Sequence, residues 1–430
     1  MSASNEDSRP GAQAAELATG VTWNVASLAV LGLAGIALNV LIGRFYGAAS
    51  LGVFNQVMGA YILFSMAAAG GINYSLLRAV AQDPHDRARV AGAVVGALLP
   101  TVLLALVVTS LFYWSRHWIA AALDSGDVAI GMRAATPGLF CFAINKQLLA
   151  VVNGMQRMRA FAVYQALRYV LILGGFLLAW RLDFSGAQLS FVWTFAEGLL
   201  LVVLAIEVMT QIAWRQATGV LHWSREHVVF GARSVLSAML LELNAKVDIW
   251  MLGLSLDDAR VGVYSLAANL AEGFYQLIVV LQNNFNPLLA NQVARGATVE
   301  SEELIRGARR WIVPSFALAA LLAAAVYPWT LPLLTADPSF QDSWLSFSIL
   351  VGAMGVLAAW LPFGNILLMA GRPATHSLLM VIVVLVNVFA NWLLIPRFGI
   401  EGAAAGTAVA FCVFALLLKI LARVQTGVRL

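Results

Sequence analysis

Residues 230–253 read Phe-Gly-Ala-Arg-Ser-Val-Leu-Ser-Ala-Met-Leu-Leu-Glu-Leu-Asn-Ala-Lys-Val-Asp-Ile-Trp-Met-Leu-Gly. This stretch is longer than the roughly 20 residues that a helix needs to cross the hydrocarbon of a bilayer. It carries Glu242, Lys246 and Asp248 near its middle, where one charged side chain costs about 2.5–3.5 kcal/mol on insertion scales. We therefore predict a membrane-spanning helix whose charged side chains face other helices or water.

Two readings of these charges stay open at this point. Glu242 and Lys246 are four residues apart, so they lie on one helix face and can pair, with Glu on the favoured N-terminal side. Such a pair can be structural and neutralise itself. Charged residues inside membrane segments are more often functional, however, and Asp248 points to another face.

The rest of the chain is equally apolar. Of its 430 residues 61% are hydrophobic and only 11% are charged, whereas a soluble domain has about 25% charged residues. The apolar segments are continuous and lack the alternation of barrel strands. We predict an all-α membrane protein with about twelve transmembrane helices and a cytoplasmic tail over residues 1–16. The segments are residues 18–43, 50–77, 90–113, 129–152, 159–181, 187–212, 229–254, 260–288, 309–333, 343–370, 374–396 and 400–424.

Basic residues in the connecting loops predict the orientation. If the N-terminus is inside, the outer loops hold only a few of them, namely Arg44, Arg116, Arg181, Arg260 and Arg397. The inner loops hold the larger set: Arg9, Arg78, Arg87, Arg89, Arg157, Arg159, Arg215, Arg225, Arg295, Arg306, Arg309, Arg310, Arg372, Lys419, Arg423 and Arg429. Because inner loops are enriched in Lys and Arg, both termini are predicted to be cytoplasmic. The net charge of +4 thus reflects topology and does not indicate a nucleic-acid partner.

An internal repeat divides the segments into two halves. Leu51-Gly-Val-Phe54 opens the second segment, and Val261-Gly-Val-Tyr264 opens the eighth. At the same offset Asn73 corresponds to Asn283. Each half then holds six helices, which predicts two parallel six-helix lobes, residues 17–215 and 216–430, around a central cavity that holds the substrate site.

The charged and amide residues inside the segments are candidates for that site. Lys146, Arg168 and Lys246 are predicted to bind an anionic head group, because phosphate oxygens accept charge-assisted hydrogen bonds. Asn283 is either a sugar contact or an interhelical hydrogen bond. The acidic residues would neutralise the cations or exchange H+ or Na+. These ion-coupling candidates are Glu197, Glu242, Asp248 and Glu272.

No enzymatic signature stands out in the sequence. It lacks a phosphate-binding Gly-Lys-Ser/Thr loop and a Gly-x-Ser-x-Gly elbow, and His222 and His227 lack the spacing of a zinc protease. We therefore expect no catalytic residue, no cofactor and no metal ligand, and any transport is secondary or facilitated.

Several motifs resemble a known family of transporters. They are Gly20, Trp23, Gly47, Leu51-Gly52-Val53, Gly70, Leu77-Arg78, Asp248-Ile-Trp-Met-Leu-Gly253, Val261-Gly-Val-Tyr264, the run from Asn283 to Pro287, Asn387-Val-Phe-Ala-Asn391, Leu394-Ile-Pro396, Phe398-Gly-Ile400 and Gly402-Ala-Ala404. In order and spacing the chain resembles the polysaccharide-transporter, or Wzx-type flippase, branch of the multidrug/oligosaccharidyl-lipid/polysaccharide exporter superfamily.

The resemblance implies two lobes in a V and a multi-pass protein of the cytoplasmic membrane. It implies an undecaprenyl-diphosphate-linked oligosaccharide as substrate, flipped to the outer leaflet for surface polysaccharide biosynthesis. H+ or Na+ is the candidate coupling ion, and a polysaccharide polymerase is a candidate partner. Two alternatives remain. An ion-coupled multidrug exporter of the same superfamily predicts a cavity dominated by carboxylates. A membrane glycan polymerase predicts a large outer loop with catalytic groups.

Overall fold

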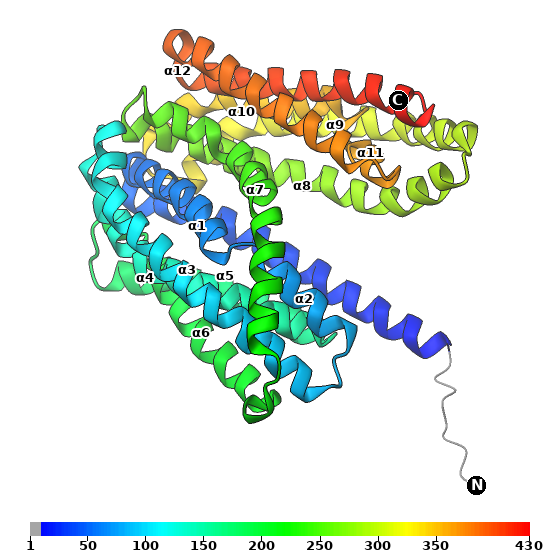
Figure 1. The fold of residues 1–430 in the computed structure, drawn as a ribbon. Coiled ribbons are helices and arrows are strands. Elements are labelled where there is room, and N and C mark those ends of the chain that lie inside the picture. The colour runs from blue at the N-terminus through cyan, green and yellow to red at the C-terminus, as the bar shows by residue number, and fades with distance from the viewer. Residues whose placement is uncertain (1–9) are drawn as a thin grey trace. The chain divides into compact units, whose positions relative to one another are not determined.

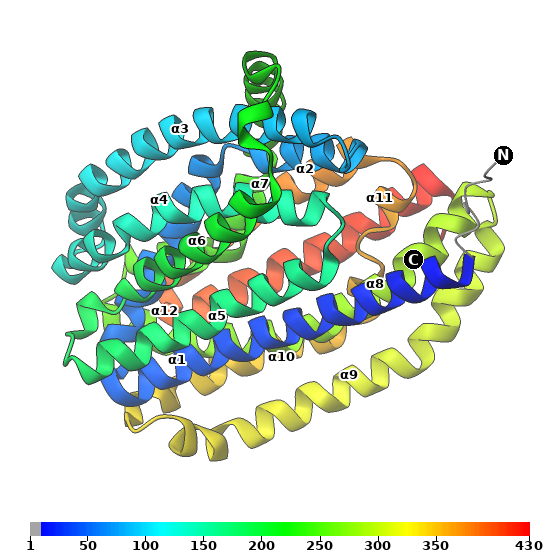
Figure 2. The ribbon, with the colours of Figure 1, turned by 90° about the horizontal axis from the view of Figure 1, so that it is seen from below.

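The computed structural model describes residues 10–430, with the backbone alone for residues 10–29, 236–238 and 240–245. The regular elements of this described part are helices and short 3-10 turns (Figures 1 and 2). The α-helices are α1 Pro10–Ala69, α2 Ile72–Gln82, α3 Arg87–Ala122, α4 Gly126–Gly154, α5 Met158–Arg181, α6 Phe191–Gln211, α7 Val220–Gly253, α8 Asp258–Ala294, α9 Thr298–Leu334, α10 Ser343–Leu357, α11 Ile366–Met369 and α12 Pro373–Thr426. The 3-10 turns are η1 Gly186–Gln188, η2 Trp214–Gln216, η3 Pro338–Asp342 and η4 Leu361–Phe363.

The predicted all-helical membrane fold is confirmed. Within the described residues, 9 helices are long and apolar enough to cross a membrane. Two of them, α1 and α12, each cover two of the predicted segments. They bend at Gly47, with φ 80°, and at Gly399, with φ 59°. Each of these two helices therefore counts as two spans. With α7 added, the spans match the twelve predicted segments.

Two predicted segments are less regular than the sequence suggests. The segment 50–77 ends at Ala69 and resumes as α2. The segment 343–370 is interrupted between α10 and α11, where Pro362 cannot donate a backbone hydrogen bond. Two side chains donate hydrogen bonds to backbone carbonyls at that break. Arg309 Nε donates to Ala359 O at 2.6 Å, and Gln282 Nε2 donates to Leu361 O at 2.7 Å.

The chain forms two compact units. One comprises the described part of Met1–Leu38 with Tyr61–Arg116 and Ile130–Met239, and the other comprises Asn39–Ala60, His117–Ala129 and Leu240–Leu430. We call them unit 1 and unit 2. The division into 17–215 and 216–430, inferred from the repeat, stays a prediction.

In unit 1, side chains from α2, α3, α4 and α6 form an apolar core. Its fully buried members include Leu76, Val94, Val151, Leu200 and Leu204. His227 of α7 is also fully buried, and it lies against this core. Its Nε2 lies 3.1 Å from Ala93 O, and its Nδ1 lies 2.8 Å from Ser75 Oγ. The first turns of α7 are therefore joined by hydrogen bonds to α2 and α3.

In unit 2, the two copies of the repeated Gly-Val motif contact each other. A Cβ on Gly52 would lie 1.8 Å from Asp258 O and 2.9 Å from Gly262 N. A Cβ on Gly262 would lie 1.8 Å from Ala48 O and 2.8 Å from Gly52 N. The second arm of α1 and the start of α8 thus pack backbone to backbone, which only glycine allows at these positions.

The bend of α1 at Gly47 is held by the turn that follows α9. Ala48 N donates to Asp337 Oδ2 at 3.2 Å, and Ser339 N donates to Asp337 Oδ1 at 2.9 Å. Arg44 Nη1 donates to Leu333 O at 2.7 Å on the other side of the bend. The hydrogen bonds from Ser339 and Ala48 lower the pKa of the Asp337 carboxyl group.

Replacing Gly52 or Gly262 by Ala should destabilise the protein, because the added methyl group would overlap backbone atoms that cannot move independently. We expect a clear fall in the unfolding temperature of the detergent-solubilised protein. Gly352→Ala is the matched control, since a Cβ there meets nothing within 4 Å, and Ala stabilises a helix by about 0.5–1 kcal/mol relative to Gly. Equal unfolding temperatures for all three variants would contradict the close packing.

Asp337→Ala should destabilise the protein at pH 7 and have less effect in acid. The pKa of Asp337 is lower in the folded state than the unfolded value of about 3.9. Its stabilising effect is therefore present above that value and is lost as the pH falls through the folded pKa. The check is thermal unfolding of wild type and variant from pH 7 to below pH 4. A difference that stays constant over this range would contradict the role of the carboxylate.

Candidate functional site

Unit 1 contains a buried ion pair between two of the predicted site residues. Arg168 of α5 and Glu197 of α6 lie 2.8 Å apart, Nε to Oε1, with side chains 10% and 3% exposed. Asn145 of α4 adds to the pair. Its Nδ2 donates to Glu197 Oε2 at 2.8 Å and to the Glu197 carbonyl at 2.9 Å. Arg168 is thus neutralised by a carboxylate that is itself fixed by an amide.

Aromatic rings lie beside this pair. Tyr61 stacks on Trp193 with ring centroids 5.0 Å apart and meets the edge of Phe142 at 6.1 Å. The Arg168 guanidinium lies 4.9 Å from the Phe142 ring, and Lys146 Nζ lies 5.6 Å from the same ring. The helical spacing of residues 142, 145 and 146 places Phe142, Asn145 and Lys146 on one side of α4. The two predicted cations of unit 1 therefore share one aromatic ring.

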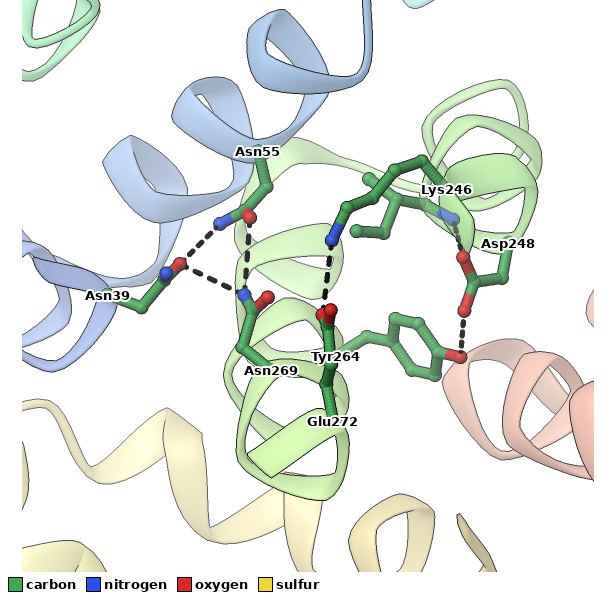
Figure 3. A network of polar contacts seen from close by, with 8 residues as sticks. Asn39, Asn55, Lys246, Asp248, Tyr264, Asn269 and Glu272 are labelled. Carbon is green, nitrogen blue, oxygen red and sulfur yellow. Dashed lines mark hydrogen bonds and ion pairs between the residues drawn. The ribbon is translucent and has the colours of Figure 1, made fainter. Parts of the chain in front are cut away.

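Unit 2 holds a second group of polar side chains, drawn in Figure 3. Asp248 of α7 is only 9% exposed and Tyr264 of α8 is fully buried. The Tyr264 hydroxyl donates to Asp248 Oδ2 at 2.5 Å, and Ile249 N donates to Asp248 Oδ1 at 2.8 Å (Figure 3). Asp248 is thus a buried carboxylate that lies within hydrogen-bonding distance of a phenol from the neighbouring helix.

Lys246 pairs across the same two helices. Its Nζ lies 3.5 Å from Glu272 Oε2, and the side chains are 14% and 52% exposed (Figure 3). The side chain of Glu242 lies outside the described residues, so its predicted pairing with Lys246 stays a prediction. The described contact neutralises Lys246 with a residue of α8, and the side chain of Glu272 stays about half exposed.

Three asparagine side chains connect α1 to α8 in unit 2. Asn39 Oδ1 accepts from Asn55 Nδ2 and from Asn269 Nδ2, each at 3.0 Å (Figure 3). Asn269 Nδ2 also lies 3.2 Å from Asn55 Oδ1. Amide hydrogen bonds of this kind hold helices together where lipid offers no partner.

Asn283 lies apart from these groups. It is exposed on α8, eleven residues beyond Glu272, which is about 16 Å along a helix. The predicted residues thus fall into separate sets. Lys146, Arg168 and Glu197 gather in unit 1. Lys246, Asp248 and Glu272 gather around α7 and α8 in unit 2.

Sequence reasoning did not identify several partners of these residues. Asn145 directly precedes Lys146 and Gln147 in the sequence, and only the fold brings it to Glu197. Tyr264 could have been found, because it occupies the position of Phe54 in the second copy of the repeat motif and so adds one hydroxyl group. Asn55 follows that same Phe54, and Asn269 lies five residues after Tyr264.

Several solved structures have a fold similar to that of this chain. A multidrug resistance MATE family transporter of the MOP superfamily, inward-facing, is 14% identical, with a TM-score of 0.77 over 92% of this chain and 94% of that one. The lipid II flippase MurJ in an inward closed conformation is 13% identical, with a TM-score of 0.74 over 94% of this chain and 88% of that one. A MOP superfamily transporter from Pyrococcus furiosus is 14% identical, with a TM-score of 0.65 over 96% and 95%.

These similarities define the fold of the chain as that of the MOP superfamily transporters. The model of the polysaccharide biosynthesis protein family matches residues 17–289, which is more than half of the chain. The chain belongs to this family, and its fold is that of multi-pass membrane proteins. The resemblance to the polysaccharide-transporter branch is therefore confirmed. No curated protein matches the sequence.

Arg168→Met should destabilise the protein strongly, because it leaves the Glu197 carboxylate buried without its cation. Breaking a buried pair in this way costs about 3–5 kcal/mol. The matched control is Arg157→Met, which breaks the pair with Glu207, where Arg157 is 40% exposed. Exposed pairs contribute less than about 1 kcal/mol. The free energy of unfolding is measured in denaturant for both variants. Equal losses of stability in Arg168→Met and Arg157→Met would contradict the burial of the Arg168–Glu197 pair.

Proposed function

We propose that the chain moves an undecaprenyl-diphosphate-linked oligosaccharide from the inner to the outer leaflet of the cytoplasmic membrane, for surface polysaccharide biosynthesis. Membership of the polysaccharide biosynthesis protein family carries this proposal. Sugars and a diphosphate cannot cross hydrocarbon unaided, because each polar group would lose its hydrogen bonds to water. A protein that binds the head group while the lipid tail stays in the bilayer removes this barrier.

The cations within the membrane segments support an anionic head group. Lys146 lies on α4 beside the Phe142 ring that the Arg168 guanidinium also approaches, and we assign the contact with the diphosphate to its ammonium group. Lys246 lies against Glu272, which would release it when a phosphate takes the place of the carboxylate. Arg168 then acts by holding α4, α5 and α6 together around Lys146.

The carboxylates support coupling to an ion. Among the predicted candidates Asp248 is buried and has a hydroxyl partner, Tyr264. A proton or Na+ taken up there would change the local charge from negative to neutral. We propose that this step drives the alternation between inward-open and outward-open states. Glu197 and Glu272 are each paired with a cation, which favours Asp248 over them.

A multidrug exporter is the second candidate, because one of the structurally similar proteins is a multidrug resistance transporter. That function needs carboxylates free to bind cationic drugs. The described pairs of Glu197 with Arg168 and of Glu272 with Lys246 argue against it.

For the flippase function, the expected partner is a polysaccharide polymerase that takes up the flipped lipid on the outer side.

The test uses proteoliposomes that hold fluorescent undecaprenyl-diphosphate-oligosaccharide in both leaflets. Accessibility of the sugar to an external glycosidase is followed with and without an imposed pH gradient. We expect protein-dependent movement that responds to the gradient and falls at least about tenfold in Lys146→Ala, the loss of one charge-assisted bond of about 1.5–3 kcal/mol. Lys419→Ala, an exposed cation on α12, should leave the rate unchanged.

Two results would overturn the proposal. If the folded protein moves no lipid under any condition, the flippase function is wrong, and efflux of a cationic dye becomes the next assay. If Lys146→Ala and Lys419→Ala behave alike, Lys146 does not bind the head group.

A further inference from the structure

One side of α8 carries a row of polar residues along the membrane span. Asn269, Glu272, Gln276 and Asn283 are spaced by three, four and seven residues, which places them within about 60° of one another around a helix of 3.6 residues per turn. Glu272, Gln276 and Asn283 are exposed, and Asn269 is half-buried. The opposite side, with Ala267, Ala271, Ile278 and Leu289, is buried in unit 2. We call these four polar residues the α8 polar row.

Exposed amides in a membrane helix need a hydrogen-bonding environment. Lipid tails offer none, so an unpaired amide facing them costs several kcal/mol. The neighbouring Asn284 shows the alternative, because its Nδ2 donates to Val280 O of its own helix at 2.9 Å. Gln276 and Asn283 have no such partner among the described residues. The polar row therefore faces water or a polar ligand.

The repeat shows that the fold itself does not require this row. At the offset that aligns Tyr264 with Phe54, the four positions correspond to Gly59, Ile62, Met66 and Asn73 in the first half. Three of the four first-half residues cannot hydrogen-bond through their side chains. At three of the four positions the second half thus has a polar side chain where the first half has none, which indicates a function specific to the second half.

The chemistry of the row fits sugars. Amide groups donate and accept, as sugar hydroxyls do, and the carboxylate of Glu272 accepts hydrogen bonds from hydroxyl groups. From Asn269 to Asn283 the row is about 21 Å long, which is more than one sugar ring covers. A compact cation or a diphosphate alone would use only part of it. We propose that the α8 polar row contacts the oligosaccharide of the transported lipid, and that Gln276 and Asn283 make transport depend on the glycan.

This inference rests on the proposed flippase function, and the experiment separates the two. Proteoliposomes contain undecaprenyl diphosphate that carries either a neutral oligosaccharide or a single sugar. Wild type is compared with the double variant Gln276→Leu and Asn283→Leu, and with Asn284→Leu as the matched control. The unfolding temperature of each variant confirms that it is folded.

We expect the double variant to move the oligosaccharide probe about tenfold more slowly, the loss of two hydrogen bonds of about 0.5–1.5 kcal/mol each. Its rate with the single-sugar probe and both rates of Asn284→Leu should equal those of wild type. Equal losses with the two probes, or no loss with either, would overturn the inference while leaving the flippase function intact. If wild type moves neither probe, the proposed function fails and the inference fails with it.

Discussion

Hydrocarbon offers no hydrogen bonds, so every polar group inside the membrane segments must find a partner in the protein or in water. The contacts of both units follow from this constraint. Glu197 is matched by Arg168 and Asn145, Asp248 by Tyr264, and the broken segment between α10 and α11 by side chains of neighbouring helices. Polar groups that lack such partners, as on α8, therefore indicate where solvent or a ligand contacts the protein.

The sequence was sufficient to predict the membrane spans, because a span needs only length and hydropathy, and both are local properties. It also identified Arg168, Glu197, Lys246 and Asp248 as unusual, since a charge in an apolar segment is visible without a structure. Partners were not predictable in the same way. Lys246 lies against Glu272 of α8, a contact between two helices that no sequence spacing reports. The sharp bends at Gly47 and Gly399 were not predicted, because in each bend a single residue takes the place of the loop that the sequence suggests.

Some equivalent positions of the internal repeat hold the same residue in both halves, and others hold different residues. Gly52 and Gly262, which are equivalent in the two halves, pack against each other in unit 2, so the shared motif is explained by backbone contact. Side chains at other equivalent positions have diverged. Tyr264 has a hydroxyl where Phe54 has none, and that hydroxyl contacts Asp248. The shared glycines thus build a backbone contact of unit 2, and the substitution of Tyr for Phe adds a hydrogen bond to a buried carboxylate.

The bend of α12 at Gly399 has a consequence for biogenesis. Figure 1 shows the second arm running back along the first, and Gly402 lies so close to Leu394 that a Cβ there would be 2.4 Å from its carbonyl oxygen. With a single glycine between them, the arms have no loop that a translocation machinery could thread separately. We expect them to enter the bilayer together as one helical hairpin. An error in the orientation of one arm during synthesis is then an error in both.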